Sequence, residues 1–179
     1  MYQSIADIYQ ANEQSLNELI ETVSGVTDEE AQLMPDDQKW SIQQIVEHVA
    51  MVEHGISRIC GRLASNARIA GKPLEGPPTP SPHFIEQSTA AASAKLEAPG
   101  HVIPTGTVKC ADSLKSIKEC QTAFEAIRTD LETYDVSEPT FPHPYFGPLT
   151  AIDWLILAGG HQKRHNQQIR RILVSLRKQ

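Results

Sequence analysis

Two histidines stand one helical turn apart near the end of the chain, in the segment HQKRHNQQI at residues 161–169. Residues four positions apart on a helix have Cβ atoms about 5–6 Å apart, so the imidazoles of His161 and His165 can reach one metal ion. The same helical stripe carries Trp154 and Ile172, which predicts that the pair faces the protein interior. Such a pair by itself is more typical of a solvated helix face, so a metal site requires a third ligand from another element.

His48 is the candidate for that third ligand. It shares a helical face with Ile45, Val49, Val52 and Ile56, and we therefore expect it to point inward. A single inward histidine is usually a hydrogen-bonded core residue, because an unpaired buried imidazole costs about 1–3 kcal/mol. Three inward histidines on two helices are more typical of a metal centre. Three protein ligands leave a fourth coordination position for water or substrate, which is the ligand count of catalytic zinc sites.

The four other histidines carry weaker expectations. One lies well around its helix from the His48 face and is expected to be exposed, and three lie in proline-rich loops and are given no specific role: His54, and then His83, His101 and His143. No general base can be assigned from the sequence. Glu47 and Glu53 flank the His48 stripe, and we expect both to be solvated helix charges.

Two consecutive glycines, Gly159 and Gly160, precede the histidine pair inside a predicted helix. A glycine in a helix interior costs about 1 kcal/mol relative to alanine. Two interpretations remain open. In the first, the glycines have no role and the protein tolerates the lower stability of the helix. In the second, their missing side chains allow a neighbouring helix to approach closely or leave room beside a ligand.

Four long amphipathic patterns predict the elements that must position these residues. They cover residues 5–24, 42–69, 113–133 and 151–177, and a short helix is expected after Thr27. Ser41 with Gln44, and Thr150 with Asp153, have the spacing of side chains that cap a helix start. Each long helix has one apolar stripe to bury, so the chain is expected to form an all-α four-helix bundle, a single domain over residues 1–179.

A long proline-rich connection joins the second and third long helices, over residues 71–111. A connection of this length in a compact domain is usually functional, mobile or contains a helix of its own. The segment FIEQSTAAASAKLEA is the candidate for such a helix. No alternating pattern in the chain predicts a β-strand.

Composition limits the class of protein. The net charge of −6 argues against general nucleic-acid binding, although the segment from His161 to Gln179 has six basic residues and no acidic one. Three cysteines without a C-x-x-C pair fit a reducing compartment better than a disulfide framework. The N-terminal segment lacks the pattern of a signal peptide, and no apolar run reaches 18 residues. A cytoplasmic protein without a membrane span is therefore expected.

Three segments carry a resemblance to a known family: KWSIQQIVEHVAMVEHG, APGHVIPTG and FGPLTAIDWLILAGGHQKRHNQQIRRIL. The first contains a tryptophan, a helix cap and His48, the second leads to the third long helix, and the last contains the histidine pair. In this order and spacing the chain resembles the DinB/YfiT-like superfamily of metal-binding four-helix bundles. By that resemblance His48, His161 and His165 correspond to the three metal-binding histidines. The long connection departs from the more compact members of the family.

The resemblance implies a divalent metal ion, usually zinc or nickel, and frequently a homodimer, but it does not fix the reaction. Relatives include S-transferases that use low-molecular-weight thiols, and others are described as metal-dependent hydrolases. Our leading interpretation is a metal-dependent thiol S-transferase that acts on a small molecule in detoxification or stress response. The alternatives are a hydrolase that uses metal-bound water and a non-catalytic metal-binding bundle.

Overall fold

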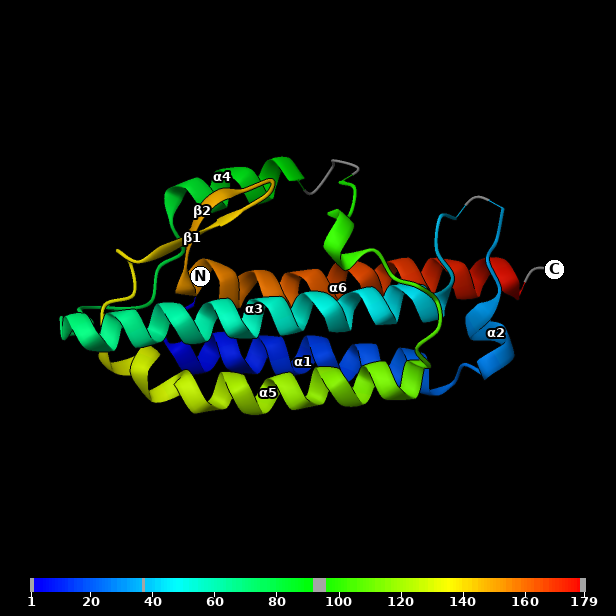
Figure 1. Ribbon diagram of the computed structural model, residues 1–179, viewed down its shortest axis with the longest axis horizontal. Coiled ribbons are helices and arrows are strands. Elements are labelled where there is room, and N and C mark those ends of the chain that lie inside the picture. Colours follow the sequence, from blue (N-terminus) through cyan, green and yellow to red (C-terminus); the bar gives the residue numbers. More distant parts are fainter. Residues whose placement is uncertain (1, 37, 92–95, 178–179) are drawn as a thin grey trace.

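The computed structural model describes residues 2–36, 38–91 and 96–177. Within these residues it contains six α-helices, one short 3-10 helix and one two-stranded sheet: α1 (Ile5–Ser24), α2 (Asp28–Gln32), α3 (Ile42–Ala70), α4 (Pro82–Ala91), η1 (Gly100–Val102), α5 (Cys110–Thr133), β1 (Thr140–His143), β2 (Gly147–Thr150) and α6 (Ala151–Leu176). The long helices α1, α3, α5 and α6 form a bundle (Figure 1). The predicted all-α four-helix bundle is confirmed.

The predicted helix starts are formed by reciprocal side-chain caps. The side chains of Thr27, Ser41 and Thr150 each accept a hydrogen bond from a backbone N–H three residues ahead, and the residue at that position accepts one from the cap backbone. These bonds satisfy N–H groups that a helix start otherwise leaves unpaired. The start of α5 was harder to predict: it lies at Cys110, three residues before the expected position, and no side-chain bond caps it.

The direction of the helices explains the long connection. In Figure 1, α3 and α5 run in one direction along the bundle, while α1 and α6 run in the other. A helix of 29 residues such as α3 is about 43 Å long. The chain must therefore return along the whole bundle before α5 can start beside the start of α3. The described parts of this return lie along α3 and α6: η1 contacts α3, and the Ala91 carbonyl at the end of α4 accepts a hydrogen bond from Arg164 of α6.

The bundle interior is filled by the apolar stripes of its helices. α3 packs against both α5 and α6, and α1 packs mainly against α6. Ile8, Leu19, Ile45, Ile117 and Ile169 are all fully buried. Among the described helices, none has both the length and the apolar composition needed to cross a membrane.

Two expectations about the connecting segments need correction. The helix expected in the connection exists as α4, but it starts two residues earlier than Phe84; residues 92–95 of the predicted helix lie outside the described residues, and residues 96–98 are not helical. The expectation of no strand is wrong, because β1 and β2 form an antiparallel hairpin just before α6. Pro142 lies opposite Pro148 in this hairpin, and two prolines in such short strands remove the residue pattern by which strands are recognised.

Candidate metal centre

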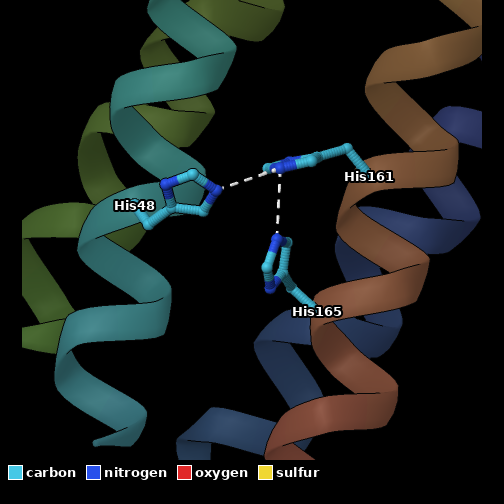
Figure 2. Close-up of side chains that lie close together, drawn as sticks. All are labelled: His48, His161 and His165. Carbon is cyan, nitrogen blue, oxygen red and sulfur yellow. Dashed lines mark hydrogen bonds between the residues drawn. The ribbon is translucent and has the colours of Figure 1, made fainter. Parts of the chain in front are cut away.

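His48, His161 and His165 lie together on the facing sides of two bundle helices. His48 projects from α3, and the other two project from consecutive turns of α6 (Figure 2). The Nε2 atom of His161 lies 3.2 Å from Nε2 of His48 and 3.1 Å from Nε2 of His165. One nitrogen from each ring lies within 4.8 Å of the others. The three imidazoles therefore converge on one small volume.

Hydrogen bonds on the far side of two rings determine which nitrogen carries the proton. His48 Nδ1 lies 2.7 Å from the backbone carbonyl oxygen of Val102, and His165 Nδ1 lies 3.0 Å from Oε1 of Gln168. Because a carbonyl oxygen can only accept, both Nδ1 atoms must carry hydrogen. In the neutral form of each ring, Nε2 then presents a lone pair toward His161.

This arrangement has more acceptors than donors, and a cation would remove the imbalance. Nε2 of His161 can carry at most one proton, so it can donate to only one of its two neighbours. The other contact would place a nitrogen lone pair at about 3 Å from a nitrogen that offers it no hydrogen. A tetrahedral zinc ion with Zn–N bonds of about 2.0–2.1 Å separates its nitrogen ligands by about 3.3 Å. The observed separations of 3.1 and 3.2 Å are close to this value, so the residues fit a metal ion.

Burial keeps these imidazoles neutral, which is the state that binds metal. Desolvation lowers the pKa of His48, and the hydrogen bond to Val102 offsets part of this effect. Desolvation also lowers the pKa of His165 to about 3, with a smaller contribution from the nearby His48. The pKa of His161 is lowered well below its usual value by desolvation and by the two other imidazoles. Protons therefore compete weakly for the three Nε2 atoms at neutral pH.

The surroundings of the cluster combine aromatic and cationic side chains. The Trp40 ring packs against His48 with centroids 4.9 Å apart. The Arg164 guanidinium lowers the pKa of both histidines of α6, so it lies close enough to add positive charge. His143 contributes a weaker effect of the same sign on the pKa of His161 and packs against Trp154 with centroids 5.2 Å apart. The hairpin thus borders the cluster, which its sequence context did not indicate.

The predicted directions of the candidate residues are largely confirmed. His48 and His165 are buried, His161 is half-buried, and the flanking Lys163 and Arg171 are exposed. His54 is exposed, as expected, and lies 2.8 Å from the Ser116 hydroxyl.

The two glutamates contradict the sequence-based expectation. Glu47 and Glu53 are 5% and 0% exposed, so neither is a solvated helix charge. Glu47 is covered by the long connection, while Glu53 faces the bundle interior, and periodicity on α3 alone could indicate neither environment.

The two glycines before the histidine pair have different environments. A Cβ atom on Gly159 would lie 2.2 Å from Oδ1 of Asn12 and 3.3 Å from its Cα, so this glycine lets α1 approach α6 closely. A Cβ atom on Gly160 would meet nothing within 4 Å. Close approach of a helix is therefore confirmed for Gly159 and does not apply to Gly160.

The groups that orient the imidazoles were only partly accessible to sequence reasoning. Gln168 lies on the predicted stripe of His161 and His165, but no spacing indicated that it would hold the ring of His165. The partner of His48 is a backbone carbonyl 54 residues away, and a carbonyl group has no residue-specific signal.

Comparison with known proteins supports the fold. A family model described as the DinB superfamily matches residues 11–169. The uncharacterized protein YuaE of Bacillus subtilis (strain 168) is 25% identical over 154 residues, which is 84% of this chain and 87% of the relative. The crystal structure of TT2238, a four-helix bundle protein, superposes with a TM-score of 0.62 at 18% identity and covers 94% of this chain and 99% of that chain.

Proposed function

The chain belongs to the DinB superfamily, and from that premise we propose that His48, His161 and His165 bind one divalent metal ion, zinc or nickel. One observation carries the proposal. The Nε2 atom of His161 lies at 3.1–3.2 Å from two other Nε2 atoms whose rings are held with the proton on Nδ1. Hydrogen bonding among the three rings cannot satisfy both contacts, whereas a shared cation can.

We further propose that the metal centre belongs to a thiol S-transferase that acts on a small electrophilic molecule. Three neutral imidazoles leave a divalent ion its full charge, and such an ion favours the thiolate form of a thiol bound beside it. In the transfer, the thiol sulfur forms a bond to an electrophilic carbon, the leaving group departs with its bonding electron pair, and the thiol proton goes to solvent.

The chain's own residues would hold the ligands and shape the site. Val102 and Gln168 fix the ring orientation of His48 and His165, so that their Nε2 lone pairs remain directed at one point. Trp40 covers one side of the His48 ring, which limits contact with water there. Arg164 adds positive charge, which favours an anionic sulfur over a neutral one.

A hydrolase remains the alternative from the sequence, and no contact of the described residues favours it. Such an enzyme needs a general base beside the metal-bound water. Of the two glutamates considered for that role, Glu47 is engaged with backbone and hydroxyl donors, and Glu53 lies in the bundle interior.

Elemental analysis of the protein purified without a histidine tag tests the metal proposal. We expect close to one equivalent of a divalent metal in the parent protein and a strong loss in His161→Ala. The matched control is His54→Ala, which removes an exposed histidine of α3 and should leave the metal content unchanged. Absence of metal after purification and after reloading would contradict the proposal.

The activity proposal is tested separately with the metal-loaded protein, low-molecular-weight thiols and a chromogenic electrophile. We expect a rate above the uncatalysed one that His161→Ala abolishes. A rate that survives this substitution would exclude the metal centre as the catalyst.

Chelation distinguishes a catalytic from a structural ion. A purely structural ion should take most of the stability with it, whereas removal of a catalytic ion from this packed bundle should leave the helices intact. A homodimer is also proposed, on the family resemblance, and a cytoplasmic location is proposed on the composition. Sedimentation of the untagged protein tests the former.

A further inference from the structure

The orientation of His48 depends on a loop. The carbonyl group that holds its Nδ1 belongs to Val102, the last residue of η1, within the long connection between α3 and α5. A backbone carbonyl can fix a ring only if its own segment is fixed. The question is therefore what holds this part of the connection against the bundle.

Glu47, the residue before His48, supplies the strongest attachment. Its Oε1 accepts hydrogen bonds from the Thr105 backbone N–H at 3.1 Å and from the Thr105 hydroxyl at 2.7 Å. Its Oε2 accepts a hydrogen bond from the Gly106 backbone N–H at 2.7 Å. The carboxylate is only 5% exposed, so water competes little for these bonds. Hydrogen bonds to a charged acceptor are also stronger than neutral ones.

A second side chain, one turn earlier on α3, also binds this loop, but it donates a hydrogen bond where Glu47 accepts. The amide of Gln43 donates a hydrogen bond to the carbonyl oxygen of Gly106, whose N–H is bound by Glu47. The backbone of Gly106 has φ +76, a conformation that side-chain-bearing residues rarely adopt, and a Cβ atom there would meet the Gln44 side chain at 3.2 Å. The loop is therefore shaped to fit this face of α3.

We propose that Glu47 is a positioning residue of the metal centre. It anchors residues 105–106, which places the Val102 carbonyl three residues earlier against His48 and holds Nε2 of that ring free of hydrogen and directed at His161. Both carboxylate oxygens bind donors of the connection, so Glu47 acts through the loop and not by proton transfer. The inference rests on the proposed metal binding of the three histidines.

The first test measures the Zn²⁺ affinity of the full-length protein by competition with a chromogenic chelator. Removing a group that orients a metal ligand typically weakens binding about 10–100-fold, and Glu47 acts one step further away, so we expect roughly a tenfold loss in Glu47→Gln. The matched control is Glu53→Gln, the same change at another buried glutamate of α3 that makes no hydrogen bond to the connection. It should change the affinity less than twofold.

The second test observes the His48 ring directly in the metal-free protein by long-range ¹H–¹⁵N spectra. In the parent protein the proton should reside on Nδ1, and in Glu47→Gln the population with hydrogen on Nε2 should rise. His165 serves as an internal reference, because Gln168 and not the loop holds its Nδ1. A merely structural effect would not be confined to one ring.

The outcomes separate this inference from the metal proposal itself. Equal Zn²⁺ affinity of Glu47→Gln and the parent protein, or an equal loss in Glu53→Gln, would overturn the positioning role. So would a loss of affinity with an unchanged His48 spectrum. If the parent protein binds no Zn²⁺ but the His48 proton shifts in Glu47→Gln, the metal proposal fails while the positioning of the ring stands. If Glu47→Gln does not fold, Thr105→Val, which removes one of the three bonds, should give a smaller loss confined to His48.

Discussion

Helix α3 carries two buried glutamates six residues apart that have opposite surroundings. Glu47 lies under the long connection, and its carboxylate accepts three hydrogen bonds from Thr105 and Gly106. Glu53 is completely buried, and neither of its oxygens has a hydrogen-bond partner among the described residues. Desolvation raises the pKa of Glu53 to about 7, and the neighbouring Gln162 amide offsets only part of this rise without reaching hydrogen-bond geometry.

The difference shows that burial alone does not decide how a carboxyl group behaves; the supply of donors does. Near Glu47 the connection turns two backbone N–H groups and one hydroxyl toward the helix. Beside Glu53, Oε1 of Gln162 has no hydrogen-bond partner and is itself an acceptor. A carboxyl group with no donors is more stable in its protonated form. Glu47, the outer glutamate, therefore has its carboxylate stabilised by three donors, whereas burial raises the pKa of Glu53, the inner one, to about 7.

The largest expected effect is a pH-dependent stability difference at Glu53. Below pH 4.5 the carboxyl is protonated in both the folded and the unfolded state, so its ionisation does not change the free energy of unfolding. Between pH 4.5 and 7 the unfolded state releases the proton while the folded state keeps it, so folding becomes less favourable as the pH rises. Above pH 7 the loss is complete, at about 3 kcal/mol, from a pKa that rises from 4.5 to about 7.

Glu53→Gln should remove this loss. The free energy of unfolding of the variant minus that of the parent protein should increase by about 3 kcal/mol between pH 4.5 and pH 8, measured by urea denaturation. Glu13→Gln, an exposed change on α1, is the control and should show a difference within about 0.5 kcal/mol. A constant difference for Glu53→Gln would mean that the folded protein ionises this carboxyl as easily as the unfolded chain.

Structural features that depend on residues close together in the sequence could be predicted, whereas features that depend on distant segments could not. The helix starts at Ser41 and Thr150 were predictable because each cap involves residues three positions apart. The inward direction of His48, His161 and His165 was predictable because helical periodicity determines it. Glu47 and Glu53 lie at the edges of the same stripe, and their burial depends on segments far away in the sequence. For Glu47 these are residues 105–106, and for Glu53 they include Gln162 on α6.

The hairpin and the start of α5 were missed for a related reason. The side chains of Lys109 and Cys110 form no cap, and the strands are four residues long with a proline in each, so neither element has a clear local pattern. Tertiary contacts define both.

A smaller effect is expected at the outer glutamate. Glu47→Gln keeps the shape of the side chain but replaces one acceptor oxygen by an NH₂ group, which cannot accept from the donors of residues 105–106. A buried N–H without an acceptor costs about 1–3 kcal/mol, so we expect a loss of about 2 kcal/mol in the free energy of unfolding at pH 8. The sign is opposite to that of Glu53→Gln at the same pH. If Glu47→Gln and Glu53→Gln changed the free energy of unfolding in the same direction at pH 8, the distinction between the two glutamates would be refuted.

The smallest effect on the free energy of unfolding is expected when one of the three hydrogen bonds to Glu47 is removed. Thr105→Val preserves the volume of the side chain and the backbone N–H to Glu47, and removes the hydroxyl that donates to Oε1 at 2.7 Å. The same hydroxyl also contacts the backbone N–H and the hydroxyl of Thr107, but both contacts are exposed, so water can replace them. The net contribution of one intramolecular hydrogen bond to a charged group is about 1.5–3 kcal/mol, and we expect a loss near the lower limit because Oε1 retains its backbone donor. Thermal unfolding of Thr105→Val and of Thr122→Val, an exposed threonine of α5, measures the difference. Equal changes in the two variants would mean that the Thr105 hydroxyl contributes nothing specific to the anchoring of the connection.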